Sequence, residues 1–306
     1  MSIDFLTEIF NNLSEYNNWT FQILQINTSK RNGTSYVSRR ISISPNDKIS
    51  ELIQDISNRY TSEELPAYEC VDNYDGASIG NRIYKLEGKG ELISTEFNSL
   101  ITTLADPNTE IDPFDLKARA SVFIGEATVN GHTYPVKLFS LQNPITTLKN
   151  KYLLSNGSFK EVSDKVLTIR TTFDAVIVGE TVYLFTMAGE NLFNMSHAYK
   201  TVCNNRIDEI IECNFISDSD AFKNVASSGH NPRRFVSFNE AHLQQLQDAD
   251  TRARIAEKFS IGYDGTTFDT VDCKNSEKLV KLLCDKGKVD PFDDSPVEVA
   301  GSKKWV

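Results

Sequence analysis

The pattern of apolar and polar positions predicts helices and strands from the first residues onward. Apolar residues recur at helical spacing over residues 2–16, so this stretch is expected to form an amphipathic helix. Residues 19–43 then alternate apolar and polar positions around Asn32-Gly33, a dipeptide that favours the left-handed backbone of a tight hairpin turn. Residues 44–60 return to helical spacing after a turn-forming entry. The chain is therefore expected to open as helix, strand, strand, helix.

The rest of the first half carries a weaker pattern and ends in a candidate boundary. Residues 61–90 are rich in turn formers and are expected to be irregular. Residues 93–106 have helical spacing, and this helix is expected to stop before Pro107. The polar segment that follows predicts a boundary between an N-terminal α+β region, residues 1–112, and a C-terminal domain, residues 113–306.

The second half repeats the hairpin signal and then becomes helical. Residues 118–141 alternate around a second Asn-Gly turn, and residues 166–186 predict two more strands. From about residue 188 the spacing is mostly helical, with a well-defined helix over 276–286 and a final strand after it. The expected fold class is α+β, with mixed antiparallel sheets built from hairpins, packed helices and a helix-rich C-terminal part. The inward positions expected in the second hairpin are Val122, Ile124, Val136 and Leu138.

Charge and composition narrow the classes of function. The formal net charge is -10, which disfavours non-specific attraction to nucleic acid or anionic lipid unless basic residues gather on one face. No run of residues reaches the length and apolarity of a membrane span, and the N-terminus lacks the basic start of a secretory signal. The five scattered cysteines, without a C-x-x-C pair, indicate reduced thiols. The chain is expected in the cytoplasm, where membrane contact would need a partner.

Four stretches resemble the B protein family of the Kiwa anti-phage defence system (the KwaB-like family). They are the strand pair LTIRTTFDAVIVGETVYLF, the helix ENLFNMSHAY, the segment NPRRF, and the C-terminal KLVKLLCDK and VEVAGSKKW. The resemblance covers roughly residues 120–306. It implies a cytosolic DNA-binding effector with double-stranded DNA as its ligand, and a homodimer. It also implies a small multi-pass membrane protein as a partner, which would recruit the chain to the inner face of the cell membrane.

Arg233 and Arg234 are the first candidates for a DNA contact. They follow Pro232, which fixes its own backbone and biases Asn231 towards an extended conformation, so the two arginines are expected to leave a defined turn. Guanidinium groups match phosphate oxygens in bidentate fashion, and such a pair could hold a DNA backbone. The alternative is a structural ion pair with a nearby carboxylate such as Glu240 or Asp248.

A second basic cluster lies in the first predicted hairpin. Lys30 and Arg31 are expected at its turn, and Arg39 and Arg40 on its returning strand, where they could track a DNA backbone. The alternative is an ordinary solvated loop. Arg252, on a helix expected to be capped by preceding aspartates, could join the patch of the first arginine pair or simply lie on a surface helix.

Catalytic chemistry has little support in the sequence. Asp112, Asp115 and Lys117 have a spacing found in nucleases, but Pro113 and the polar surroundings indicate a loop. Asp174 lies between apolar strand segments and is expected to bond to a turn. No nucleotide-binding glycine loop and no catalytic histidine motif occurs, so neither a cofactor nor a metal is predicted.

Two hypotheses of function remain open, and a third has less support. The first is a non-catalytic DNA-binding effector that blocks replication or transcription of phage DNA. The second is an acidic module that binds a basic protein partner or mimics DNA. A metal-dependent nuclease is the third and has the weakest support.

Overall fold

The structure is a computed structural model that divides into two compact units. It describes residues 3–29, 33–43, 47–71, 74, 81–90, 92–147, 151–155, 158–162, 165–290 and 295–298. The first unit comprises Met1–Asn73 and Asn81–Met195, and the second comprises Tyr74–Gly80 and Ser196–Val306. The α+β fold class predicted from the sequence is confirmed, since a mixed sheet with helices forms the first unit and helices dominate the second.

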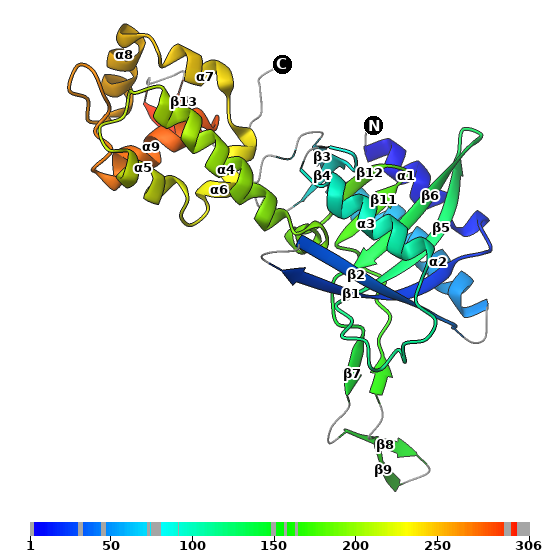
Figure 1. Cartoon of the computed structure of the whole chain (residues 1–306). Coiled ribbons are helices and arrows are strands. Elements are labelled where there is room, and N and C mark those ends of the chain that lie inside the picture. The colour runs from blue at the N-terminus through cyan, green and yellow to red at the C-terminus, as the bar shows by residue number, and fades with distance from the viewer. Residues whose placement is uncertain are drawn as a thin grey trace. The chain divides into compact units, whose positions relative to one another are not determined.

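An eight-stranded sheet forms the centre of the first unit. Its order is β2-β1-β5-β6-β11-β12-β4-β3, and all neighbours are antiparallel except the pair β3 and β4 (Figure 1). The two hairpins predicted from the sequence are present in it, and so are two strands within residues 166–186, β11 and β12. The strands are β1 (Thr20–Ser29), β2 (Gly33–Ile41), β3 (Glu69–Val71), β4 (Arg82–Glu87), β5 (Ala120–Val129), β6 (His132–Ser140), β11 (Ala175–Val178) and β12 (Thr181–Leu184).

Turn chemistry explains why the long hairpin forms where the sequence predicts it. Asn130 and Gly131, between β5 and β6, have φ angles of 52° and 77°, the left-handed backbone that a two-residue hairpin turn requires. Across this hairpin Val122, Val136 and Leu138 are fully buried, and Ile124 is only partly buried. Successive side chains on β5 and β6 point to opposite faces of the sheet, and apolar residues are buried on both faces.

Between β6 and β11 the chain forms two small two-stranded sheets. One pairs β7 (Ile145–Thr147) with β10 (Lys165–Leu167), and the other pairs β8 (Lys151–Ser155) with β9 (Ser158–Val162). Figure 1 shows them extending away from the ends of strands in the main sheet as an arm. The arm therefore leaves and re-enters the sheet next to the ends of β5 and β6.

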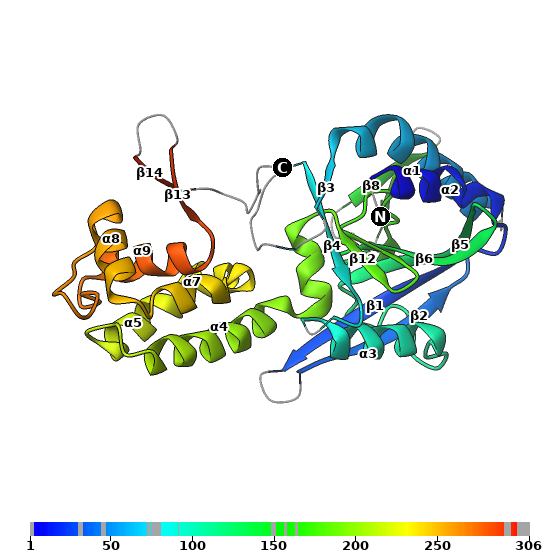
Figure 2. The same ribbon diagram turned by 90° about the horizontal axis from the view of Figure 1, so that it is seen from above.

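Helices cover both faces of the sheet. The helices α1 (Ile3–Asn11) and α2 (Asp47–Arg59) lie on one face, and α3 (Ser94–Ala105) lies on the other (Figure 2). Sheet side chains satisfy the carbonyl end of α3, because Ser38 donates to the carbonyl oxygen of Thr103 and Gln22 donates to that of Leu104. The short helical turns of this unit are Leu13–Glu15, Tyr60–Glu64, Leu65–Ala67 and Met187–Phe193.

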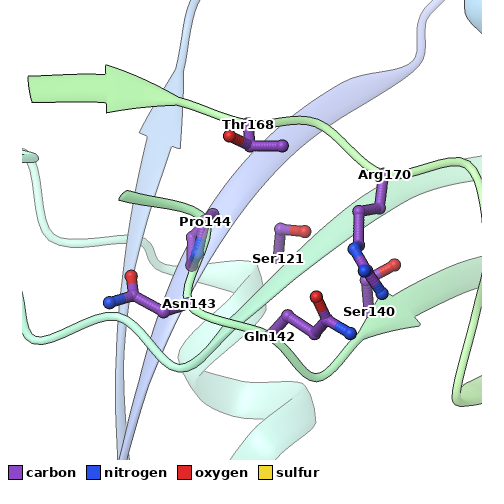
Figure 3. Close-up of a pocket in the computed structure, with 7 residues that line it drawn as sticks. All are labelled: Ser121, Ser140, Gln142, Asn143, Pro144, Thr168 and Arg170. Carbon is purple, nitrogen blue, oxygen red and sulfur yellow. The ribbon is translucent and has the colours of Figure 1, made fainter. Parts of the chain in front are cut away.

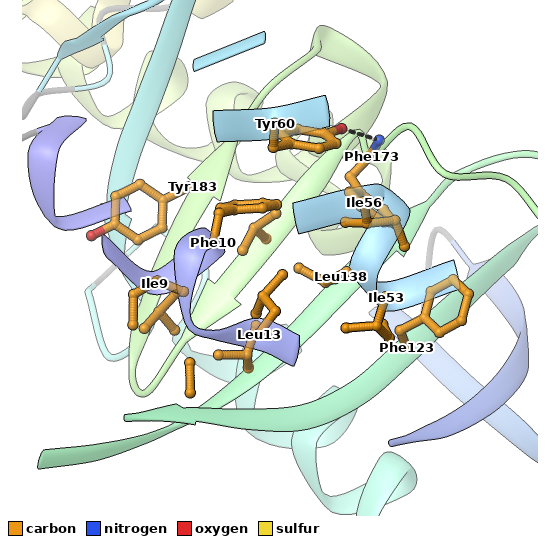
Figure 4. Packing of buried hydrophobic residues seen from close by; sticks show 14 of the residues in the cluster. Ile9, Phe10, Leu13, Ile53, Ile56, Tyr60, Phe123, Leu138, Phe173 and Tyr183 are labelled. Carbon is orange, nitrogen blue, oxygen red and sulfur yellow. Dashed lines mark hydrogen bonds between the residues drawn. The ribbon is translucent and has the colours of Figure 1, made fainter. Parts of the chain in front are cut away.

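Aromatic packing closes the core between the sheet and the first two helices. Tyr60 stacks between Phe10 and Phe173, with ring centroids 4.5 and 5.4 Å away (Figure 4). Its hydroxyl oxygen accepts a hydrogen bond from the backbone N–H of Phe173 at 2.8 Å. Burial raises the pKa of Tyr60, so the hydroxyl stays neutral.

The second unit is built from helices around its own core. Three of the helices begin at an aspartate whose side chain accepts a backbone N–H, namely Asp218, Asp248 and Asp272. The core gathers Phe215, Phe222 and other buried residues. The elements are α4 (Met195–Glu212), α5 (Ser219–Ala226), α6 (Asn231–Arg234), a short helical turn (Phe235–Ser237), α7 (Glu240–Gln245), α8 (Ala249–Phe259), α9 (Cys273–Leu283), β13 (Gly287–Val289) and β14 (Pro296–Glu298).

Two expectations about the organisation of the chain were wrong. The predicted boundary between 112 and 113 runs through the first unit, because β1 pairs with β5 and so joins both predicted regions in one sheet. The segment 61–90 was expected to be irregular, yet its described part contains β3 and β4. These short strands form through pairing with distant β12 and with each other, which local periodicity does not reveal.

The hydroxyl of Tyr60 gives a test of the core. We expect Tyr60→Phe to lower the free energy of unfolding by about 1–3 kcal/mol, because it leaves the buried N–H of Phe173 without its acceptor. Urea unfolding followed by fluorescence measures the change. Tyr134→Phe is the matched control, since the Tyr134 ring packs edge-on against Phe5 but its hydroxyl bonds to no described residue. An equal loss in both variants would contradict this account.

Candidate functional site

The seven basic residues predicted to contact DNA divide between the two units. Arg39 and Arg40 lie on β2 of the first unit, and Arg233, Arg234 and Arg252 lie in the second. Lys30 and Arg31 lie outside the described residues. Each described arginine has its own surroundings, and these differ in how much of the guanidinium group is left for a ligand.

Arg234 takes part in the packing of the second unit. Its Nη1 donates to Oδ1 of Asn231 at 2.5 Å and lies 3.6 Å from Oε1 of Glu277, an ion pair of the kind weighed in the sequence. The partner differs from the carboxylates expected, since Glu240 lies 2.9 Å from Arg206. The expected extended conformation of Asn231 was also wrong. Asn231 begins α6, where Pro232 is tolerated because the first helical turn needs no N–H donor.

Arg233 lies against an aromatic ring. Its guanidinium carbon is 5.5 Å from the centroid of the Tyr199 ring, within the range of a cation–π interaction. Tyr199 in turn donates its hydroxyl proton to the hydroxyl of Tyr74 at 2.8 Å. The side chain of Arg233 is half-buried, so its orientation is set by the unit to which it belongs.

Arg252 caps the end of a neighbouring helix. Its Nη1 donates to the carbonyl oxygens of Leu246 and Gln247, both at 2.8 Å, just after α7 ends. Cationic side chains stabilise these unpaired carbonyls at a helix C-terminus. Asp248 caps the start of α8, as predicted, and hydrogen bonds from Thr251 hold the pKa of this carboxyl below its usual value.

Arg39 and Arg40 are neighbours on β2 but differ in exposure. β2 is an edge strand of the sheet, and successive side chains on a strand point to opposite faces. Arg39 is half-buried and donates to the carbonyl oxygen of Asn108 at 3.3 Å. Arg40 is exposed and makes no hydrogen bond or ion pair with another described residue. Only Arg40 of this pair therefore presents its whole guanidinium group to solvent.

A polar cavity of about 180 Å³ lies where the arm joins the sheet (Figure 3). Its floor is formed by Ser121 and Ser140, which lie directly opposite each other on β5 and β6. No residue of this cavity was predicted as a site from the sequence. Arg170 was visible in the strand segment, but its neighbours come from distant parts of the chain. The lining residues are Ser121, Ser140, Gln142, Asn143, Pro144, Thr168 and Arg170.

Backbone hydrogen bonds fix the two segments that form the rim of the cavity. The N–H of Thr168 donates to the carbonyl oxygen of Pro144 at 2.7 Å, which ties the outgoing and returning segments together. Asp174 accepts the N–H of Leu141 at 2.7 Å and the hydroxyl of Thr186 at 2.6 Å. Asp174 was expected to cap the turn in residues 171–176, but its carboxylate bonds to Leu141 and Thr186, which are distant in the chain. The rim is therefore held in place by the sheet itself.

The residues considered for metal or nuclease chemistry do not gather in the described structure. Oδ1 of Asp112 accepts the N–H of Phe114 within a loop, and no three His, Cys, Asp or Glu side chains among the described residues form a metal-binding group. No helix in the described part of the chain is long and apolar enough to cross a membrane.

Comparison with known proteins gives one match. Residues 132–287, just over half of the chain, match the family model described as Kiwa protein KwaB-like. No curated protein and no solved structure matches the chain. The matched range begins at β6 and runs through α9 to the start of β13.

The cap formed by Arg252 can be tested by stability. We expect Arg252→Ala to lower the free energy of unfolding by about 1–2 kcal/mol, because two carbonyl oxygens at the end of α7 lose a charged donor. Arg254→Ala is the control, since Arg254 is exposed on the same helix. Urea unfolding of both variants measures the difference, and equal stability of the two would argue against the cap.

The carboxyl of Glu277 predicts a pH dependence. Lys281 at 3.1 Å and Arg234 at 3.6 Å hold the pKa of Glu277 below its usual value. A lowered pKa contributes stability above the unfolded-state pKa, and this contribution is lost as pH falls through the folded-state pKa. We expect Glu277→Gln to lower the free energy of unfolding near neutral pH by less than about 1 kcal/mol, because the pair is partly exposed.

The difference between Glu277→Gln and the wild type should shrink between neutral pH and about pH 3, because acid protonates the carboxyl as pH falls through its lowered pKa. Glu257→Gln, at an exposed position on α8, is the control and should show no such convergence. Urea unfolding at both pH values makes the comparison. A difference that persists unchanged in acid would contradict the ion pair.

Proposed function

Because the chain belongs to the Kiwa protein KwaB-like family, whose members serve anti-phage defence, we propose that it is the DNA-binding effector of such a system. In this proposal it holds duplex DNA through phosphate contacts without cutting it. Occupancy of the DNA then obstructs replication or transcription of the phage genome. The resemblance of the C-terminal half supports this role.

The observation that carries the proposal is the exposed guanidinium group of Arg40 on an edge strand. It has no hydrogen-bonding or ionic partner among the described residues, so a phosphate would not have to displace one. The same strand begins at Gly33, shortly after Lys30 and Arg31 in the sequence. A basic hairpin of this kind can follow a DNA backbone with little base readout. Arg234 and Arg252, whose guanidinium groups hold the second unit together, contribute less in this proposal than the sequence suggested.

The proposal includes two partners that the resemblance implies. A homodimer would double the number of phosphate contacts, which helps a chain with a net charge of -10 to reach useful affinity. A small multi-pass membrane protein would recruit the effector to the inner face of the cell membrane. A second candidate is a module that binds a basic protein, and the net negative charge favours it.

Salt dependence of DNA binding tests the proposal. We expect fluorescence anisotropy with labelled duplex DNA to show affinity that falls linearly on a log–log plot against salt. Arg40→Ala should weaken binding and reduce that slope by about 1, the effect of losing one phosphate contact. Lys30→Ala/Arg31→Ala should reduce it further. The DNA should stay intact on a gel after incubation with Mg²⁺.

The control is Arg254→Ala, which removes an exposed arginine from the second unit and should leave the slope unchanged. Absence of binding at low salt would refute the DNA-effector proposal for the isolated chain and favour the protein-binding candidate. An unchanged slope in the hairpin variants would reject the assignment of the site.

A further inference from the structure

The polar cavity beside the arm has the chemistry of an anion site. Among its seven lining residues Arg170 is the only charged one, and none is an aspartate or glutamate. Arg170 is thus the charged side chain that lines the cavity, while the carboxylate of Asp174 lies beside the rim, where it accepts the N–H of Leu141.

Three polar groups at this cavity have no partner in the described part of the chain. They are the guanidinium group of Arg170, the carboxamide of Gln142 and the hydroxyl of Ser121. Ser121 is only 4% exposed, but its hydroxyl is not among the fully buried polar atoms that lack a partner, which agrees with access from the cavity. A ligand or water in the cavity would satisfy it. The other two groups lie at the rim, where Figure 3 shows them around the same space.

The other two polar side chains with bonds at the cavity, Ser140 and Asn143, already have hydrogen-bond partners within the chain. The Ser140 hydroxyl donates to the carbonyl oxygen of Thr172, so it offers only its lone pairs to the cavity. Oδ1 of Asn143 accepts the N–H of Ile145 at 2.9 Å, which holds the rim in a turn. The backbone of the rim is thus fixed before a ligand enters, and the exposed side chains of Gln142 and Arg170 would become ordered on binding.

We propose that this cavity binds the phosphate group of a small phosphomonoester. Donors from three separate segments surround the space, and a tetrahedral oxyanion can accept from several directions at once, whereas a carboxylate offers two coplanar oxygens. A volume of about 180 Å³ exceeds the roughly 30 Å³ that one water molecule occupies in the liquid and accommodates a phosphate group. This inference does not rest on the proposed DNA binding.

The position of the cavity gives its occupant a structural consequence. The rim consists of the two chain segments that lead into and out of the arm, residues 141–144 and 168–170. A phosphate held by Gln142 on one segment and Arg170 on the other would bridge them. Occupancy would therefore stabilise the base of the arm, where the two segments share the backbone hydrogen bond from Thr168 to Pro144.

Isothermal titration calorimetry of the full chain tests the proposal with inorganic phosphate and adenosine monophosphate as probes. We expect saturable binding by the wild type and a loss of about tenfold or more in Arg170→Gln, the effect of losing a charge-assisted hydrogen bond. Arg170→Lys keeps the charge but not the planar fork and should bind with intermediate affinity. Ser121→Ala should weaken binding without changing the charge.

Arg119→Gln is the matched control, because Arg119 is exposed in the same unit and does not line the cavity. It should bind both probes like the wild type. Circular dichroism and thermal unfolding check that each variant folds. Equal affinity of Arg170→Gln and the wild type would overturn the site, and so would absence of saturable binding by the wild type. Acetate binding as tight as that of phosphate would overturn the assignment to a phosphate.

A second experiment identifies the source of the phosphate group. A short duplex with a 5′-phosphate is compared with the same duplex with a 5′-hydroxyl, in the wild type and in Arg170→Gln. Phosphate-dependent binding that Arg170→Gln abolishes would support the site with a DNA end as its source. Binding of adenosine monophosphate alone would support it with a free nucleotide as its source. Salt-dependent duplex binding that Arg170→Gln leaves intact would show that the cavity and the basic hairpin act separately.

Discussion

The pairing of β1 with β5 is the constraint on which the first unit depends. Each of the two long hairpins has its own turn, but an isolated hairpin cannot bury its apolar faces. The register from Thr20 opposite Ile124 to Leu24 opposite Ala120 joins them into one sheet. Gly125 is essential to this junction, because a methyl group there would lie 2.4 Å from the indole of Trp19. The indole N–H donates to the carbonyl oxygen of Leu13, which fixes the end of the first helical segment against the sheet.

The same register also places the polar cavity. It sets Ser121 opposite both Ile23 on β1 and Ser140 on β6, so the apolar row across the sheet ends in two hydroxyl groups. Apolar packing stops there, and the chain leaves β6 to form the arm. When it returns, Asp174 fixes Leu141 and Thr186 together, and the rim is complete. The cavity thus lies where the packed part of the sheet ends and the arm begins.

Local chemistry accounts for the parts of the fold that the sequence predicts well. An Asn-Gly dipeptide defines the long hairpin because its backbone preference is independent of what lies around it, and Asp248 predicts the start of α8 for the same reason. β3 and β4 were not predicted, since β4 forms by pairing with the distant β12, and β3 in turn pairs with β4. The cavity was not predicted either, because Arg170 and Ser121 are distant in the chain and come together only once the sheet has formed. For the arginines, the sequence identified the residue type but not its partner, as Glu277 is distant from Arg234 in the chain.

The arginines of the two units meet different structural demands. The second unit contains several short helices, whose terminal carbonyl groups are numerous relative to their length and need donors. Arg252 supplies two such bonds, and Arg234 joins α6 to α9, so these guanidinium groups are used in folding. In the first unit the sheet satisfies its own backbone, and the exposed guanidinium groups of Arg40 and Arg170 are not required by any described carbonyl or carboxylate. Positive charge that the fold does not need is positive charge available to a ligand. For this acidic chain we therefore base the proposed anion contacts on arginines that the fold does not use, and not on their clustering in the sequence.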